Sequence, residues 1–308
     1  MTTRAMGPMA GLDWLKRGLN LGRHNPKAIF GGAAVLVAAV FVVALVVSLL
    51  MSGLAAAFGQ GSAGAMAIGL LTIVLMLLAM SILMVGYFRL LDAVEHGQPA
   101  RALDVLAGFR DLPTSGRMMG FMLSLTVLQN LLLLVVVGTL ASDFGAWYLA
   151  NMQASMGGGT PAPMTAPPAG FGLAFVVIVI IGLFCYAVQA IGFGQIALRG
   201  RGIGGALADG GAGAAKNLLP LLVFALTMFA AMLLLGVAIL LVAGIGGLLV
   251  KLLGTWVGIL LGVPLYAAFI IGVVVVMFGV MYYLWRDVAG GGEPPAVKPA
   301  DSGHHIEL

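Results

Sequence analysis

Charged residues are scarce in this sequence. Asp, Glu, Lys and Arg together make up 8% of the 308 residues, whereas hydrophobic residues make up 61%. Soluble domains carry about 25% charged residues, which keep their surfaces solvated. A chain so poor in charge would leave a soluble surface largely apolar, so we exclude a soluble domain and predict a protein whose surface faces lipid.

Cysteine is nearly absent, since Cys185 is the only one. A single cysteine excludes an intrachain disulfide, and a cysteine-based metal site would need further ligands. The net charge is +4. The basic residues behind it collect at one face of the predicted membrane domain, so we expect no nucleic-acid partner. We also expect no cofactor, because the sequence carries no metal-binding or nucleotide-binding motif.

Six apolar stretches are long enough to cross a bilayer, which takes about 20 helical residues. No Asp, Glu, Lys, Arg or His lies within them. Proton-driven carriers place ionisable groups at membrane depth. This absence argues against a proton-driven pump but leaves open a passive pore or a carrier of apolar molecules. The sequence predicts an all-α membrane protein with a six-span domain over 28–288, the spans being 28–51, 64–88, 118–141, 170–198, 217–243 and 255–285.

Lys and Arg are distributed unevenly between the two sides of these stretches. Every one except Lys251 lies in the N-terminal segment, in the second-to-third or fourth-to-fifth connection, or in the C-terminal tail. Basic residues are retained on the cytoplasmic side of membrane proteins. We therefore predict that the N-terminal segment 1–27 and the tail 289–308 are both cytoplasmic, which requires an even number of spans.

Three segments that precede a span have the apolar spacing of an amphipathic helix. In one of them this face is formed by Ala102, Val105, Leu106 and Phe109. The same spacing occurs in 12–19 and, more weakly, in 203–214. Amphipathic helices with basic flanks lie at a membrane surface, where anionic lipids attract Lys and Arg. We predict an interfacial helix in each place, with lipid headgroups contacted by Lys16, Arg17, Arg110, Arg117 and Lys216.

An interfacial helix followed by two spans recurs three times in this order. The pattern predicts three parallel repeats over about 10–91, 100–199 and 203–287. Between the spans, 142–169 is rich in Gly and Pro and predicts a flexible loop. The Gly-rich segment 244–254 predicts a tight turn with a short interfacial helix. The tail 289–308 has the composition of a disordered segment.

Few polar residues lie inside the predicted spans, and two interpretations are open for them. They could line a passage between the third and fourth spans, or they could form hydrogen bonds between packed helices. We favour packing, because each amide can find a partner in a bundle. The candidate polar lining consists of Gln129, Asn130, Gln189 and Gln195.

The second-to-third connection carries four residues that resemble a set of metal ligands, namely Asp92, Glu95, His96 and Asp104. Arginines are interleaved with them, so we predict a solvated charged connection and no metal site. The sequence shows no nucleophile with a base positioned nearby. We therefore predict that the protein is not an enzyme.

Two short stretches carry a resemblance to a known family. They are Trp14-Leu15-Lys16-Arg17-Gly18 with Asn25-Pro26, and Leu90-Leu91-Asp92-Ala93-Val94-Glu95-His96-Gly97-Gln98-Pro99 with Phe109-Arg110. They resemble an uncharacterised family of proteobacterial multi-pass inner-membrane proteins. The pattern is more distantly similar to the membrane domains of some glycerophosphodiester phosphodiesterases. The resemblance implies a bacterial inner-membrane location and about six spans, and it implies no activity.

Two functional hypotheses follow from the sequence. The first is a non-catalytic inner-membrane protein that organises lipid or partner proteins, because basic interfacial helices accompany a charge-free bundle. The alternative is a passive channel or carrier for a small or amphiphilic solute, lined by the four amide residues. Membrane lipids are the expected partners. Small-residue seams such as Gly258 and Gly262 serve association with a second copy or another protein as well as internal packing.

Overall fold

The computed structural model describes residues 3–58, 62–156 and 170–291. These residues are largely helical and contain no strand, which confirms the predicted all-α membrane fold. Six helices are long and apolar enough to cross a membrane. They are α2 (Pro26–Phe58), α3 (Ala63–Glu95), α4 (Leu112–Leu140), α6 (Phe171–Arg199), α8 (Leu218–Leu253) and α9 (Thr255–Val288). The shorter elements are α1 (Ala10–Leu19), η1 (Leu21–Arg23), η2 (Ala102–Arg110), α5 (Ser142–Met156) and α7 (Ile203–Lys216).

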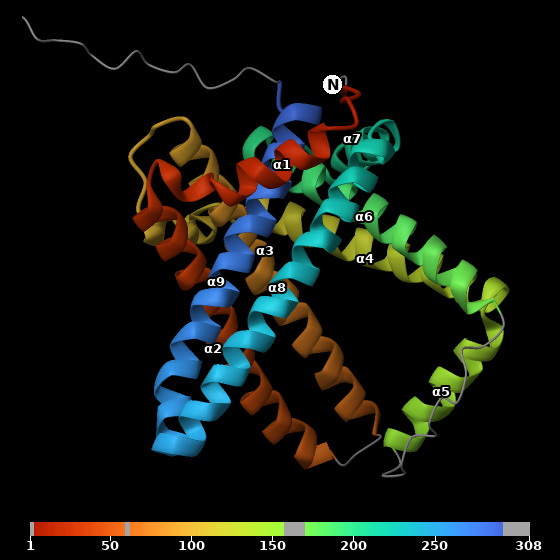
Figure 1. Cartoon of the computed structure of the whole chain (residues 1–308). Helices are drawn as coiled ribbons and strands as arrows, with labels where there is room; N and C mark the ends of the chain where they lie inside the picture. The colour runs from red at the N-terminus through yellow and green to blue at the C-terminus, as the bar shows by residue number, and fades with distance from the viewer. Residues whose placement is uncertain (1–2, 59–61, 157–169, 292–308) are drawn as a thin grey trace, which may run out of the picture.

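The long helices form three hairpins, α2–α3, α4–α6 and α8–α9, which join at one end and spread apart toward the other (Figure 1). Buried side chains gather at the joined end, mainly on the C-terminal halves of α3, α6 and α9. We call these three the central helices. Phe88 of α3 meets Phe193 of α6 with ring centroids 5.8 Å apart and Phe278 of α9 at 6.0 Å, both edge to face. The core therefore lies where one helix of each hairpin converges.

The first helix of each hairpin, α2, α4 or α8, is its outer helix. Two of these, α2 and α4, begin at residues suited to a helix start. Pro26 opens α2, and the Asn25 side chain accepts a hydrogen bond of 3.1 Å from the Ala28 N–H. At α4, the Asp111 carboxylate accepts from the Thr114 N–H at 3.2 Å. Such caps satisfy amide groups that have no partner within the helix. Capping thus fixes where α2 and α4 leave the joined end, whereas α8 begins after Asn217 without a side-chain cap.

The short helices η2 and α7 pack on the hairpin that precedes each of them in the chain. η2 packs on α2 and α3, and α7 packs on α4 and α6. α1 has no preceding hairpin and packs instead on α8 and α9, the last one. The predicted order of one short and two long helices is present three times, with α5 inserted in the second unit. The three units therefore close into a ring, which α1 completes.

Glycine allows the short helices to approach the central helices closely. A Cβ atom at Gly108 of η2 would collide with the carbonyl oxygen of Ile82 on α3. We expect Gly108→Ala to lower the free energy of unfolding by about 1–3 kcal/mol, because the backbones must move apart. Gly116→Ala on α4 is the matched control, since a Cβ there meets nothing within 4 Å. Thermal unfolding followed by circular dichroism in detergent compares the two variants. Equal melting temperatures would contradict this close packing.

The structure corrects the predicted face of the second interfacial segment. η2 is a 3-10 helix, in which side chains three residues apart share a face. Val105 is accordingly buried, whereas Leu103, Leu106 and Phe109 form an exposed stripe. The prediction of a single face formed by Ala102, Val105, Leu106 and Phe109 is wrong, because it assumed the i, i+3, i+4, i+7 spacing of an α-helix.

Two predicted connections are also wrong. Residues 142–156 form α5 rather than a flexible loop, and Phe144 of α5 packs against Phe171 at the start of α6 with centroids 5.4 Å apart. Residues 244–253 continue α8 instead of making a turn, and the chain reverses at Gly254, whose φ of 98° favours glycine. The rest of the predicted loop, 157–169, and the tail from 292 lie outside the described residues.

Candidate functional site: a polar hub where three helices end

The C-terminal ends of the three central helices meet at the joined end of the hairpins. Each is followed by a glycine with positive φ: Gly97 at 66°, Gly200 at 64° and Gly291 at 101°. Glycine in this conformation commonly ends helices. The last carbonyl groups of a helix lack intrahelical partners and carry partial negative charge. Positively charged donors stabilise three such ends in one place, and we call this region the hub.

Three arginines supply these donors in a closed ring. Arg89 of α3 donates to the carbonyl of Ala197 on α6 at 3.1 Å. Arg199 of α6 donates to the carbonyl of Gly290, just beyond α9, at 2.6 Å. Arg286 of α9 pairs with the carboxylate of Glu95 on α3 at 3.3 Å. Each central helix therefore holds the end of the next through one arginine, and the third returns to the first.

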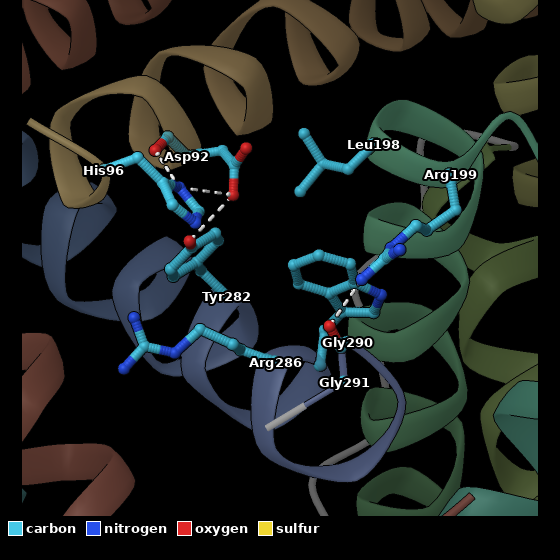
Figure 2. Close-up of a pocket in the computed structure, with 9 residues that line it drawn as sticks. Asp92, His96, Leu198, Arg199, Tyr282, Arg286, Gly290 and Gly291 are labelled. Atoms are coloured by element: carbon cyan, nitrogen blue, oxygen red, sulfur yellow. Dashed lines mark hydrogen bonds and ion pairs between the residues drawn. The ribbon is translucent and has the colours of Figure 1, made fainter. Parts of the chain in front are cut away.

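A second link joins α3 to α9 beside this ring. The Tyr282 hydroxyl donates to the Asp92 carboxylate at 2.9 Å, as Figure 2 shows. Nδ1 of His96 lies 2.8 Å from the carbonyl oxygen of Asp92 and 3.4 Å from its carboxylate. The guanidinium of Arg286 lies over the Tyr283 ring, 4.9 Å from its centroid. The acidic residues of α3 are thus held by α9 or by their own helix.

The short helix α1, near the N-terminus, binds to the hub through contacts with the C-terminal end of α9. Trp14 Nε1 donates to the Asp287 carboxylate at 3.0 Å, and Arg17 forms an ion pair with the same carboxylate. Arg17 also lies over the Tyr283 ring, 4.7 Å from its centroid. The Trp14 side chain is fully buried. These contacts are how α1 completes the ring of units.

A further ion pair ties the hub to the start of α4. Arg89 donates to the Asp111 carboxylate at 2.6 Å. This hydrogen bond, with those from Thr114, holds the pKa of Asp111 below its ordinary value. A carboxyl group whose pKa is lowered by folding stabilises the fold at pH values above its ordinary pKa. This contribution is lost as the pH falls through the lowered pKa. The pair therefore stays ionised at neutral and mildly acidic pH.

A cavity of about 350 Å³ lies among the helix ends. Its polar lining comes from all three central helices and consists of Asp92, His96, Arg199, Tyr282, Trp285 and Arg286. In Figure 2, Arg199 on α6 lies across this space from Asp92 and His96 on α3. Among the described residues, no three His, Cys, Asp or Glu side chains are grouped as a metal site would require. We call this space the hub cavity.

A second, apolar cavity of about 710 Å³ lies between α8 and α9, away from the hub. Its lining includes Leu235, Gly246 and Val250 of α8, and Gly262 and Tyr266 of α9. Glycines on both helices leave this space open, since a Cβ at Gly246 or Gly262 would meet nothing within 4 Å. We call it the α8–α9 cleft.

The four amide residues of the predicted lining are not brought together around either cavity. Asn130 is exposed and donates to the Thr126 carbonyl of its own helix at 2.8 Å. Gln129 and Gln189 are half-buried, whereas Gln195 is fully buried. Residues that line one wall of a passage would share a similar degree of burial. These four range from exposed to fully buried.

The five predicted headgroup contacts divide into two groups. Lys16 and Arg110 are exposed. The others are engaged within the protein: Arg17 binds Asp287, Arg117 donates to the Gly200 carbonyl at 2.5 Å, and Lys216 donates to the Thr3 carbonyl at 3.0 Å. Lys216 is exposed as well, but Thr3 holds its ammonium group, so of these five Lys16 and Arg110 are the two whose charged groups have no partner among the described residues.

The hub itself was missed from the sequence. The segment around Asp92 and Glu95 was expected to be solvated, and this is wrong for Glu95, whose side chain is 6% exposed. A signal was present, since Arg89, Asp92 and Glu95 are spaced three apart and share one helix face. Charges placed in this way at the end of an apolar helix point to a buried partner.

Comparison of the chain with known protein families, curated proteins and solved structures finds no match. The resemblance to multi-pass inner-membrane proteins therefore stays a prediction.

Proposed function

We propose that this integral membrane protein organises lipid around three spread hairpins, without catalysing a reaction, and that the hub end faces the cytoplasm. The observation that carries the proposal is where packing stops. None of the most apolar 18 residues of α8 is buried, and only 6% of those of α2 and α9 are. Helices that are apolar all round and unpacked need lipid on every side.

The hub provides the rigidity that such a scaffold needs. Buried aromatic rings and the arginine ring hold the hairpins at one end, so that their other ends stay apart. Lipid then fills the space between hairpins, because an apolar surface in a bilayer costs nothing when acyl chains cover it.

The hub end has features suited to a membrane surface. The exposed stripe of η2 consists of Leu103, Leu106 and Phe109. Arg110, the last residue of η2, and Lys16 on α1 are also exposed. Apolar side chains enter the acyl boundary while Lys and Arg attract anionic headgroups, each by about 1 kcal/mol. This arrangement supports placing the hub end at the cytoplasmic leaflet.

The α8–α9 cleft offers a direct test, because we expect it to hold an acyl chain. Gly246→Leu fills the cleft and should reduce, by at least half, the fraction of molecules that retain a phospholipid. Native mass spectrometry of protein released from phospholipid nanodiscs measures this fraction. Gly244→Leu is the matched control, since Gly244 is exposed on the same helix and does not line the cleft. Equal retention in both variants, or a wild type without lipid, would count against the proposal.

A further inference from the structure

Basic side chains without a partner gather at the base of the first hairpin. Within the described residues, five exposed cations at the joined end make no ion pair and donate to no acceptor. They are Lys16 on α1, Arg23 on η1, Lys27 on α2, Arg101 just before η2 and Arg110 at its end. The basic residues of α4, α6, α7 and α9 at this end are instead engaged within the protein, as are those between α6 and α7, namely Arg117, Arg199, Arg201, Lys216 and Arg286.

Packing brings two of these cations together. η1 and η2 both pack on α2, and in Figure 1 they lie on one side of the joined end, away from α7. A Cβ atom at Gly31 of α2 would lie 2.9 Å from the Cβ atom of Ala102. Lys27 lies one helical turn before Gly31 on the same face of α2, and Arg101 directly precedes Ala102. Lys27 and Arg101 therefore flank the same contact.

Nearby carboxylates do not balance this charge. On α1, η1, η2 and the first turn of α2, the exposed carboxylates are Asp13 and Asp104, against five exposed cations. Asp104 accepts from the backbone N–H of Arg101 at 2.7 Å. Asp111, which follows η2, is already paired with Arg89. The base of the first hairpin therefore keeps a net positive charge.

The apolar stripe of η2 lies beside the apolar part of α3. A Cβ atom at Gly86 of α3 would collide with the carbonyl oxygen of Val105, and one at Gly108 with that of Ile82. Gly86 and Ile82 precede Glu95, the end of α3, by 9 and 13 residues, or about 14–20 Å at 1.5 Å per residue. The charged residues of α3 all lie nearer the hub than this contact. The stripe is therefore at the depth where α3 meets acyl chains.

The exposed surface of η2 differs from those of α1 and α7. Leu103, Leu106 and Phe109 are 66%, 37% and 56% exposed. α1 exposes a single large apolar side chain, Leu19, and α7 exposes none. Among these three short helices, η2 is thus the one that combines an apolar surface with cations at both ends. Such a combination is typical of segments that bind an anionic membrane leaflet.

We propose that the base of the first hairpin binds the headgroup of an anionic phospholipid, with its phosphate between Lys27 and Arg101 and its acyl chains along the η2 stripe. Phosphate oxygens form strong hydrogen bonds with Lys and Arg. A zwitterionic headgroup carries a positive group that offsets its phosphate, so the net positive charge here selects an anionic lipid. This inference rests on the proposed function, because the hairpins must lie in lipid, and adds which lipid binds and where.

Fluorescence quenching by brominated lipids tests the site in the full chain. Leu106→Cys in a Cys185→Ala background carries a bimane label on the stripe. The vesicles contain equal parts of phosphatidylglycerol and phosphatidylcholine, with one or the other brominated. We expect the lipid beside the label to favour phosphatidylglycerol about fivefold, the effect of one cation near a membrane surface.

Two variants separate the site from general charge. Lys27→Gln combined with Arg101→Gln should reduce this preference to about onefold, because both headgroup contacts are lost. Lys251→Gln is the matched control, since Lys251 is an exposed cation at the far end of α8 and its removal should change nothing. Salt of about 0.5 M should weaken the preference of the unsubstituted site, because it screens exposed charges. Equal quenching by both lipids, or a preference that survives the double substitution, would overturn the site.

A second label distinguishes this inference from the proposed function. Leu240→Cys in the same background carries it on α8, where Leu240 is 73% exposed. We expect both brominated lipids to quench it equally. Quenching there but none at Leu106→Cys would show that the stripe faces water as a surface for a soluble partner, which overturns the inference alone. No quenching at either position would contradict the proposed function as well.

Discussion

Trp14→Ala is expected to lower the free energy of unfolding by about 3–5 kcal/mol, the range for removing a large buried aromatic side chain. Trp14 is fully buried and donates to Asp287, so the substitution leaves a cavity and removes a hydrogen bond. The whole protein should be destabilised, because α1 is the element that joins the first unit to the last. Thermal unfolding followed by circular dichroism in detergent measures the effect.

Leu19→Ala is the matched control for this prediction. Leu19 lies on the same helix and is 62% exposed, so truncation should change the free energy of unfolding by less than about 0.5 kcal/mol. A similar melting temperature for both variants would show that α1 is an appendage. The ring of units would then not depend on its closing helix.

Glu95→Gln is expected to cost about 3–5 kcal/mol of stability, because it leaves Arg286 without its counter-charge in a buried place. The Arg286 side chain is 13% exposed and that of Glu95 is 6% exposed. Glutamine matches glutamate in size, so packing is preserved and the loss reports the charge. Urea or thermal unfolding in detergent provides the free energies.

Asp111→Asn provides the comparison for Glu95→Gln. The Arg89–Asp111 pair is about one-third exposed on both sides, and pairs of this kind contribute about 1 kcal/mol or less. Asparagine also retains the helix cap at α4. We therefore expect the substitution in the hub to cost several times more than the one at its edge. Equal losses of stability in the two variants would mean that the Arg286–Glu95 pair contributes no more than a surface ion pair.

Hydropathy and charge were sufficient to predict the long helices and their order. Each span is an uninterrupted apolar run, and such a run in lipid has no alternative to a helix, because its backbone groups must bond within the segment. The pattern of one short and two long helices follows from where basic residues interrupt these runs. The six helices and their threefold order could therefore be derived from local composition.

The short elements were harder to predict, for physical reasons that particular residues illustrate. In η2, Gly108 lies in close contact with the backbone of α3, a tertiary contact that the local sequence does not report. At 244–253, glycine suggested a turn, yet glycine is common in membrane helices. In α5, Phe144 packs against Phe171 across a Gly- and Pro-rich segment, so overall composition was a poor guide.

The hub was hidden because its partners are distant in sequence. Glu95 pairs with Arg286 across 191 residues, and Trp14 binds Asp287 across 273. No local pattern reports such pairings. The exposed residues Lys16 and Arg110 could be predicted as surface charges, whereas Arg17 and Lys216 have the same local context and bind partners within the protein. Their partners, Asp287 and Thr3, become neighbours only when the ring of units closes.

The most direct test of lipid organisation is a spin-label scan along residues 231–242 of α8 in phospholipid nanodiscs. Cys185→Ala provides a background in which each introduced cysteine is the only one. Accessibility to oxygen, which dissolves in lipid, is compared with accessibility to a water-soluble nickel chelate. If lipid surrounds the spread hairpins, every position should be accessible to oxygen and none to nickel. Protection from oxygen recurring every three to four residues would show a packed bundle, and a stripe accessible to nickel would show an aqueous passage; either result would contradict the proposed function.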